Sequence, residues 1–192
     1  MNTASENDRI TVKKAAGHLS TVLRHRHMVM YHCIKAGIPW RGLMHDLSKL
    51  SPTEFIPGAR YYQGSRSPNE REREVNGCSL AWMHHKGRNR HHFEYWTDYS
   101  TVTRQAEPVM MPEVFLFEMF CDRVAASKIY NRGSYTDSMP LEYFLRAKGR
   151  RIIEKRTAER LEFLLRMLAD RGEEATFRYI RRRVRRLRGG TK

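Results

Sequence analysis

The amino-acid sequence predicts an all-α protein. Apolar residues recur at helical spacing along most of the chain, and proline or capping residues stand where several of these segments begin. No stretch of useful length alternates apolar and polar residues as a half-buried strand does. The 192 residues suffice for one domain with a sizeable core. We therefore expect one helical domain at residues 10–148, with a basic helical extension at residues 149–192 packed on the same domain.

The N-terminal half is expected to begin with a long helix. Residues 10–36 carry apolar side chains at helical spacing, and Gly37 follows at a position that suits a helix end. Pro39 begins a short helix that is expected to carry His45 and Asp46. Two more helices are expected where a capping serine is followed by proline and, three residues on, by glutamate. These segments are Ser51-Pro52-Thr53-Glu54 and Ser67-Pro68-Asn69-Glu70, and the second helix is expected to run to about residue 86.

The C-terminal half is expected to be helical after an irregular stretch. Residues 87–109 are rich in histidine, arginine, asparagine and aromatic residues and show no clear period. An apolar helix is expected from Pro112 to about Asn131. Three further helices are expected near residues 139–148, 151–171 and 173–188.

The composition excludes several classes of protein. Hydrophobic residues make up 40% and charged residues 30% of the chain, which is typical of a globular protein. No run of eighteen apolar residues predicts a membrane span, and the polar first residues lack the apolar core of a signal peptide. Three well-separated cysteines argue against a zinc finger or a disulfide framework. We expect a cytoplasmic protein without membrane contact.

The positive charge is concentrated near the C-terminus. The formal net charge is +15, and residues 146–192 hold 17 Lys/Arg against 6 Asp/Glu. Seven arginines between residues 178 and 188 favour binding to the phosphate backbone of nucleic acid. A solvated helix face would account for the same residues, so both interpretations stay open.

Residues of metal-ligand type stand on successive predicted helices. Imidazole nitrogen combined with carboxylate oxygen suits Mn, Fe, Co, Ni, Zn or Mg. A single histidine is more often structural than a ligand, but several such groups together are typical of an open catalytic metal site. The groups are His18, His25, His27 and His32 on the first helix, His45-Asp46, His84-His85 with His91-His92, and Asp122 in an apolar run.

The order His, His-Asp, His-His, Asp on helices resembles the HD superfamily of metal-dependent phosphohydrolases. The segment His45-Asp46-Leu47-Ser48-Lys49 is similar to the H-D-h-G-K element of that family, with Ser48 where glycine is usual. His84-His85-Lys86 resembles the HH(E/K) element of its bimetallic branch. Longer segments, HDLSKLSPTEF, YYQGSRSP, AWMHHKGRNRHHFEYW and CDRVAASK, resemble an uncharacterised family of short proteins with a domain of unknown function, over roughly residues 17–180.

The HD resemblance implies a set of metal ligands. One divalent ion would be held by His25, His45, Asp46 and Asp122, and a second by His84 and His85, with Asp46 bridging the two. His18 remains an alternative to His25, because the two histidines have similar sequence surroundings. The protein would therefore bind one or two ions.

The same resemblance implies hydrolysis of a phosphomonoester or phosphodiester, with a phosphorylated small molecule or a nucleotide as the substrate. Asp46 would act at the metal, and Lys49, Lys86 and Arg88 would neutralise phosphate charge. The histidine pair runs into Asn89-Arg90-His91-His92 instead of the DGxGYP of cyclic-di-GMP enzymes, so that substrate is not implied. Two alternatives remain: a nucleic-acid-binding protein that uses the arginine-rich helix, and an HD-type di-iron oxygenase.

Overall fold

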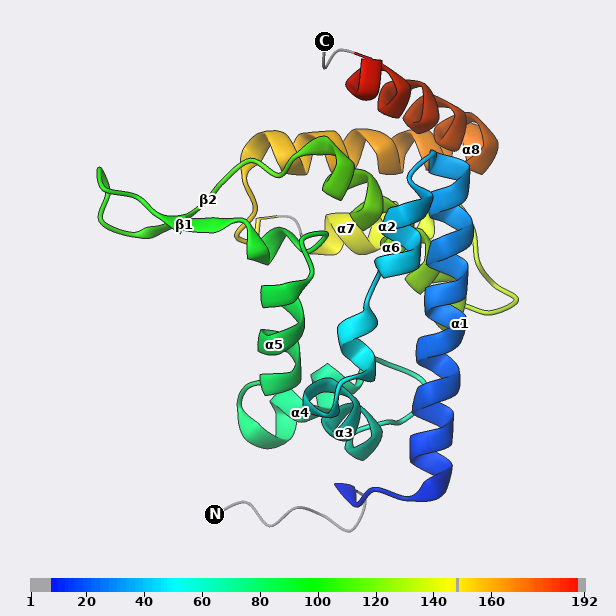
Figure 1. Ribbon diagram of the computed structural model, residues 1–192, viewed down its shortest axis with the longest axis vertical. Coiled ribbons are helices and arrows are strands. Elements are labelled where there is room, and N and C mark those ends of the chain that lie inside the picture. The colour runs from blue at the N-terminus through cyan, green and yellow to red at the C-terminus, as the bar shows by residue number, and fades with distance from the viewer. Residues whose placement is uncertain (1–7, 148, 190–192) are drawn as a thin grey trace. The chain divides into compact units, whose positions relative to one another are not determined.

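A computed structural model describes residues 8–147 and 149–189, and these residues are mostly helical, as predicted (Figure 1). They form two compact units. The first unit contains residues 8–27 and 46–89, and the second contains residues 28–45 and those from 90 onward. The long helix α1, Val12–Ala36, supplies its N-terminal part to the first unit and its C-terminal part to the second. No helix in the described ranges is both long and apolar enough to cross a bilayer.

The first unit is built from short helices around α3. They are the 3₁₀ helix η2 (Leu47–Leu50), α3 (Pro52–Arg60), α4 (Pro68–Asn76) and α5 (Leu80–Arg88). Helix α3 contacts η2, α4 and α5. The predicted starts at Pro52 and Pro68 are confirmed. The preceding serines, however, make no side-chain capping bond, so the expected capping boxes do not form.

The helix expected to run from residue 68 to about residue 86 is in fact two helices. Gly77 adopts a left-handed conformation (φ 77°) that ends α4. Ser79 then begins α5, because its hydroxyl accepts a hydrogen bond from the Trp82 backbone N–H at 3.0 Å. The break places a histidine pair on a separate helix that packs against α3.

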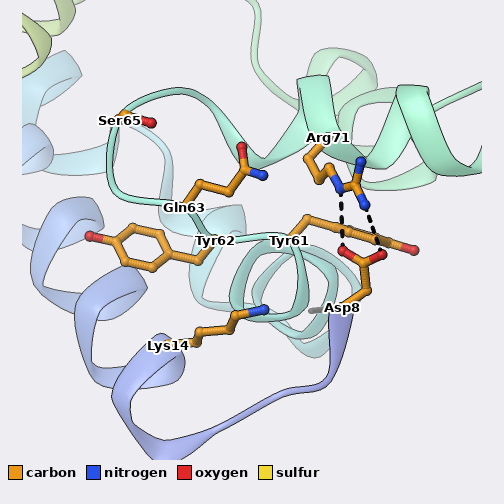
Figure 2. A pocket seen from close by; sticks show the side chains of 7 residues that line it. All are labelled: Asp8, Lys14, Tyr61, Tyr62, Gln63, Ser65 and Arg71. Atoms are coloured by element: carbon orange, nitrogen blue, oxygen red, sulfur yellow. Dashed lines mark hydrogen bonds and ion pairs between the residues drawn. The ribbon is translucent and has the colours of Figure 1, made fainter. Parts of the chain in front are cut away.

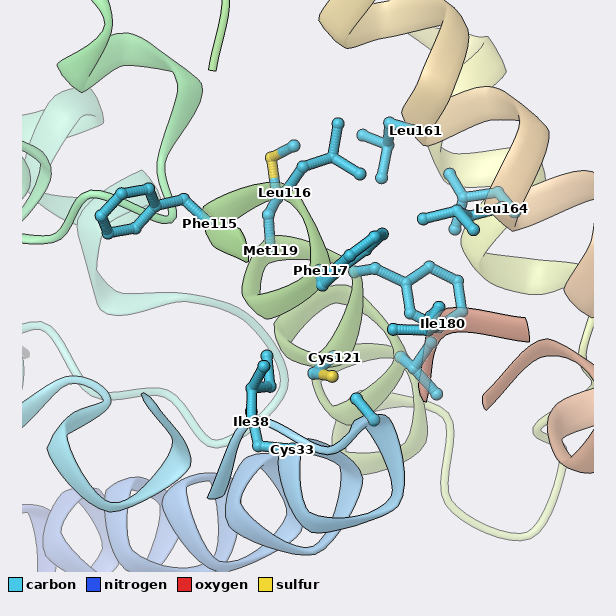
Figure 3. Close-up of a cluster of buried hydrophobic side chains, with 14 of the residues drawn as sticks. Cys33, Ile38, Phe115, Leu116, Phe117, Met119, Cys121, Leu161, Leu164 and Ile180 are labelled. Atoms are coloured by element: carbon cyan, nitrogen blue, oxygen red, sulfur yellow. The ribbon is translucent and has the colours of Figure 1, made fainter. Parts of the chain in front are cut away.

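The second unit contains the larger apolar core. Its elements after α1 are α2 (Pro39–Met44), η3 (Phe93–Tyr95), β1 (Thr97–Tyr99), β2 (Ala106–Pro108), α6 (Glu113–Tyr130), α7 (Met139–Arg146) and α8 (Lys155–Gly189). Helix α6 packs against α7 and α8, and residues from all three belong to the core. Figure 3 labels core residues of α6 and α8, together with Cys33 and Ile38. Strands β1 and β2 pair antiparallel, with Thr97 opposite Pro108. At three residues each, they are too short for an alternating pattern to reveal them.

Two features of the second unit bear on function. Helix α6 carries apolar side chains on all of its sides, and every residue from Phe115 to Cys121 is buried, including Glu118. Helix α8 is interrupted by non-helical backbone at Gly172 (φ 75°, ψ 174°). The break falls between the two helices expected at residues 151–171 and 173–188, which confirms that prediction.

Candidate metal centres

His45 and Asp46 lie in a turn and not in a helix, so the expectation that a short helix carries them is wrong. Helix α2 ends at Met44, and His45 continues in a non-helical conformation. Asp46 is left-handed (φ 51°, ψ 29°), a conformation that aspartate adopts more readily than most residues. Both side chains are almost completely buried. The boundary between the two units falls at the peptide bond that joins them.

A buried glutamate holds two histidines in the first unit. Glu54 lies on α3, and its two oxygens are each 2.7 Å from a histidine Nδ1, one of His84 and one of His85 on α5. A carboxylate only accepts, so each imidazole donates from Nδ1, and in its neutral form the lone pair is on Nε2. This is the arrangement in which second-shell carboxylates orient metal-binding histidines. We call Glu54, His84, His85, Asp46 and Lys49 the Glu54 cluster.

His85 is held between two carboxylates. Its Nδ1 faces Glu54, and its Nε2 is 3.3 Å from Oδ1 of Asp46. Burial lowers the pKa of His85, but the charge of Asp46 and the hydrogen bonds to Asp46 and Glu54 raise it by more, so this pKa lies above its usual value. The other oxygen of Asp46 is 2.7 Å from Nζ of Lys49. These contacts favour a positive charge between His85 and Asp46.

A second buried glutamate holds two histidines in the second unit. Oε1 of Glu118 lies 3.1 Å from Nδ1 of His45 and 3.4 Å from Nδ1 of His91. The two imidazole rings are 4.3 Å apart, and ligand atoms of these three residues all lie within 4.8 Å of one another. The other oxygen, Oε2, is 3.7 Å from Nη1 of Arg41. We call His45, His91, Glu118 and Asp122 the Glu118 cluster.

His45 repeats the arrangement of His85. Its Nδ1 faces Glu118, and its Nε2 is 3.6 Å from Oδ1 of Asp122. Asp122 follows Glu118 by four residues on α6, which places both carboxylates on one face of the helix. Burial raises the pKa of Glu118, but the hydrogen bonds from His45 and His91 lower it by more. Glu118 is therefore a carboxylate although it is buried.

These distances fit a divalent cation. Two ligand atoms about 2.1 Å from one ion at a tetrahedral angle are about 3.4 Å apart. The His85–Asp46 and His45–Asp122 separations of 3.3 and 3.6 Å bracket that value. A neutral imidazole that donates from Nδ1 would turn its Nε2 lone pair toward a carboxylate oxygen, which is repulsive unless a cation or a proton lies between them. Nitrogen and oxygen donors of this kind bind Zn, Mn, Fe, Co or Ni.

The structure places the two candidates for the first ligand in different surroundings. His18 and His25 are both buried on α1. The His18 ring packs against the rings of Phe55 and Tyr62, and burial, with the nearby charge of Lys49, lowers its pKa to about 4. His18 therefore packs against aromatic rings in the first unit.

The predicted phosphate-binding residues differ in exposure. Lys49 forms the ion pair with Asp46 described above. Lys86 is half-buried, and Arg88 is exposed in the last turn of α5, one turn beyond His84. Arg88 and Lys86 are thus on the helix that carries the histidine pair.

The sequence motifs do not reveal the two glutamates. Glu54 stands at the capping position of a predicted helix, whereas its carboxylate binds His84 and His85. Glu118 is one charge in an apolar run, and its place four residues before Asp122 is the signal that could have found it. His91 stands out in the sequence only as part of a histidine-rich stretch.

The first unit also contains a pocket of about 590 Å³ (Figure 2). None of the residues that line it belongs to the Glu54 cluster. Arg71 is held there by Asp8, with Nη2 3.1 Å from Oδ2, and Lys14 donates to the carbonyl of Arg60. Both cations are thus partnered within the protein. The residues that line it are Asp8, Lys14, Tyr61, Tyr62, Gln63, Ser65 and Arg71.

Comparison with known proteins places the chain in a family. Residues 14–167 match the model of the Family of unknown function (DUF5662). The chain belongs to this family. No curated protein and no solved structure matches it. The DUF5662 match confirms the predicted membership of an uncharacterised family, whereas the likeness to the HD superfamily rests on the motifs alone. The match includes both clusters and ends before the arginine-rich segment at residues 178–188.

Proposed function

We propose that this DUF5662 protein is a metal-dependent phosphohydrolase that binds divalent metal at its buried histidine–carboxylate clusters. One observation carries the proposal: in each unit a histidine is held between two carboxylates, at separations that fit an intervening cation. The order of these residues along the chain supports it, because it resembles that of the HD phosphohydrolases.

The proposed ligands differ between the clusters. In the second unit, His45 and Asp122 are the ligand pair, and Glu118 orients the imidazoles of His45 and His91. In the first unit, the ligands are His84, His85 and Asp46, and Glu54 orients both imidazoles. The sequence resemblance assigns His25 and Asp46 to the same ion as His45 and Asp122, and that assignment rests on sequence.

The protein's own residues would prepare hydrolysis in three ways. Glu54 and Glu118 fix the imidazole tautomers, so that Nε2 presents its lone pair. Lys49, Lys86 and Arg88 supply positive charge for phosphate oxygens. A bound divalent ion would supply the remaining chemistry by lowering the pKa of water and polarising the phosphoryl group. The substrate class is a phosphomonoester or phosphodiester, with a nucleotide as the first candidate.

A di-iron oxygenase is the second candidate. In this case Glu118 would be a ligand instead of an orienting group. His45, His91 and Glu118 offer two histidines and one carboxylate, the donor set that holds a single iron in many non-haem oxygenases. Metal identity separates the two functions. Redox-active iron with an O₂-dependent optical change would favour the oxygenase, and activity with Mn, Co, Ni or Mg would favour hydrolysis.

The test combines elemental analysis of the purified protein with a screen of nucleotides and phosphodiesters in added Mn, Co, Ni or Mg. Asp46→Ala and Asp122→Asn should abolish hydrolysis and lower the bound metal while the helix content stays the same. Asp98→Asn, at an exposed aspartate in β1, is the matched control and should behave as the wild type. Full hydrolysis by Asp46→Ala would refute the proposal.

A further inference from the structure

The second half of α8 carries a surface of arginines. From residue 175 to 189 the chain has seven arginines and no acidic residue. Six of the seven are exposed, and we call these six the arginine face. Arg183 differs from them, because it is half-buried and its guanidinium hydrogen-bonds Glu113 at 3.0 Å. The arginine face consists of Arg178, Arg181, Arg182, Arg185, Arg186 and Arg188.

The opposite side of the same helix is anchored in the core of the second unit. Phe177, Ile180 and Val184 follow one another at helical spacing and are 2%, 0% and 4% exposed. Their burial fixes the rotation of the helix and turns the arginine face outward. An amphipathic helix that binds a membrane needs its apolar side for the lipid, and here that side is already used.

The chemistry of the arginine face matches phosphate. Guanidinium groups bind phosphate oxygens through two parallel hydrogen bonds, which ammonium groups cannot do. At about 1.5 Å rise per residue, residues 178–188 extend about 15 Å, enough to follow several phosphates of one strand. Arg178 pairs with Glu174, but the side chain of Glu174 is 85% exposed. An ion pair this exposed contributes little, so Arg178 can exchange Glu174 for a phosphate.

We infer that the arginine face binds the phosphate backbone of nucleic acid without sequence preference. The inference is independent of the proposed metal chemistry, because no member of either metal cluster belongs to the surface. A row of cations on a rigid helix would neutralise successive phosphates and release their counterions, which makes binding steeply dependent on salt. An acidic protein or lipid surface would lack this regular series of phosphates.

The test measures binding of labelled single- and double-stranded DNA and RNA over a series of salt concentrations. The logarithm of the binding constant should fall steeply with the logarithm of salt concentration. The triple variant Arg182→Gln, Arg185→Gln, Arg186→Gln should reduce this slope by roughly three, because each arginine that neutralises one phosphate adds about one to it. The triple variant with lysine at the same positions keeps the charge and should retain most of the slope.

A matched control removes the same charge elsewhere in the second unit. Arg104, Lys155 and Arg156 are exposed, and their triple replacement by glutamine should leave the slope unchanged. An equal reduction of the slope in this control would show that only net charge matters and would overturn the inference. So would a wild type without a salt slope, or stronger binding to phosphatidylserine vesicles than to any oligonucleotide. Circular dichroism of the variants confirms that each is folded.

Discussion

In both clusters a buried glutamate binds two histidines, but the surroundings of the two glutamates differ. In the first unit, each oxygen of Glu54 binds one imidazole, and the two histidines are neighbours on a single helix. In the second, one oxygen of Glu118 serves both imidazoles, and its partners His45 and His91 are far apart in the chain. The first arrangement depends on local structure around α5, and the second depends on the folded core around α6.

The histidines of the two clusters differ in exposure. The side chain of His84 is 19% exposed, whereas those of His45 and His91 are 0% and 2% exposed. Each cluster also has another partly exposed member, Lys49 at 31% in the first and Asp122 at 18% in the second. His84 therefore meets solvent more easily than either histidine of the Glu118 cluster. We expect the removal of a histidine to cost more stability in the Glu118 cluster than at His84.

The largest difference is expected from removing one histidine of each cluster. His45→Ala leaves Glu118 and Asp122 facing each other without the imidazole, and we expect it to lower the free energy of unfolding by about 3–5 kcal/mol. His84→Ala removes a half-buried ring and should cost about 1 kcal/mol. Urea denaturation of both metal-free variants measures the two values. Equal costs would contradict the expected difference between His45 and His84.

The glutamates should control both metal affinity and stability in each unit. Glu54→Gln and Glu118→Gln should each weaken metal binding about 10–100-fold, because the variants no longer carry the charge that orients the imidazoles. Both variants should also lower the free energy of unfolding, because each glutamate is buried and binds two histidines. Calorimetric titration with Mn²⁺ measures the affinity, and Glu142→Gln, at an exposed position on α7, serves as the control. Unchanged affinity in both variants would exclude the orienting role.

A pH series compares the units through one buried histidine in each. Burial lowers the pKa of His18 to about 4, and burial together with the charge of Lys128 lowers that of His32 to about 4. The unfolded chain takes up these protons below about pH 6.5, and the folded protein does not until about pH 4. Stability should therefore fall as the pH drops through this window, by about 1.4 kcal/mol per pH unit for each histidine.

Histidine variants show which unit causes this decrease in stability at low pH. His18→Gln and His32→Gln should each remove the uptake of one proton from the pH dependence of stability. His27→Gln, at an exposed site on α1, is the matched control. If the units unfold together, both variants change the same transition. If they unfold separately, each changes only the transition of its own unit. A pH dependence that neither variant alters would contradict the assignment.

Signals confined to a few neighbouring residues made much of the fold predictable. Proline at a first helical position located the starts of α2, α3 and α4. The two helices expected at residues 151–171 and 173–188 meet at the break that Gly172 makes in α8. The turn at His45–Asp46 was missed because a helical pattern does not reveal that one aspartate is left-handed. The break at Gly77 was missed for a similar reason, since glycine inside a helical pattern is often tolerated.

The candidate site could be predicted only in part. The histidines and aspartates of the site are predictable because metals bind these residue types. Their order along the chain, which resembles that of the HD superfamily, indicates which of them belong together. From sequence Glu54 is predicted only as the glutamate of a capping box, and its contacts with His84 and His85 come from the packing of α3 against α5. Glu118 acts on His45 across 73 positions of the chain, a pairing that comes from the packing of α6 and not from any local pattern.

The smallest expected effect tests how far the Glu54 cluster depends on the flexibility of α5. Gly87 lies inside this helix, and a methyl group added there would meet nothing within 4 Å. Gly87→Ala should therefore raise the free energy of unfolding by about 0.5–1 kcal/mol, because the unfolded chain loses conformational freedom. Gly77→Ala also has open space but requires a positive φ, so it should cost about 1 kcal/mol. Thermal denaturation orders the two variants, and metal titration of Gly87→Ala should match the wild type. Weaker metal binding in that variant would show that the helix end beside His84 and His85 must move for the ion to enter.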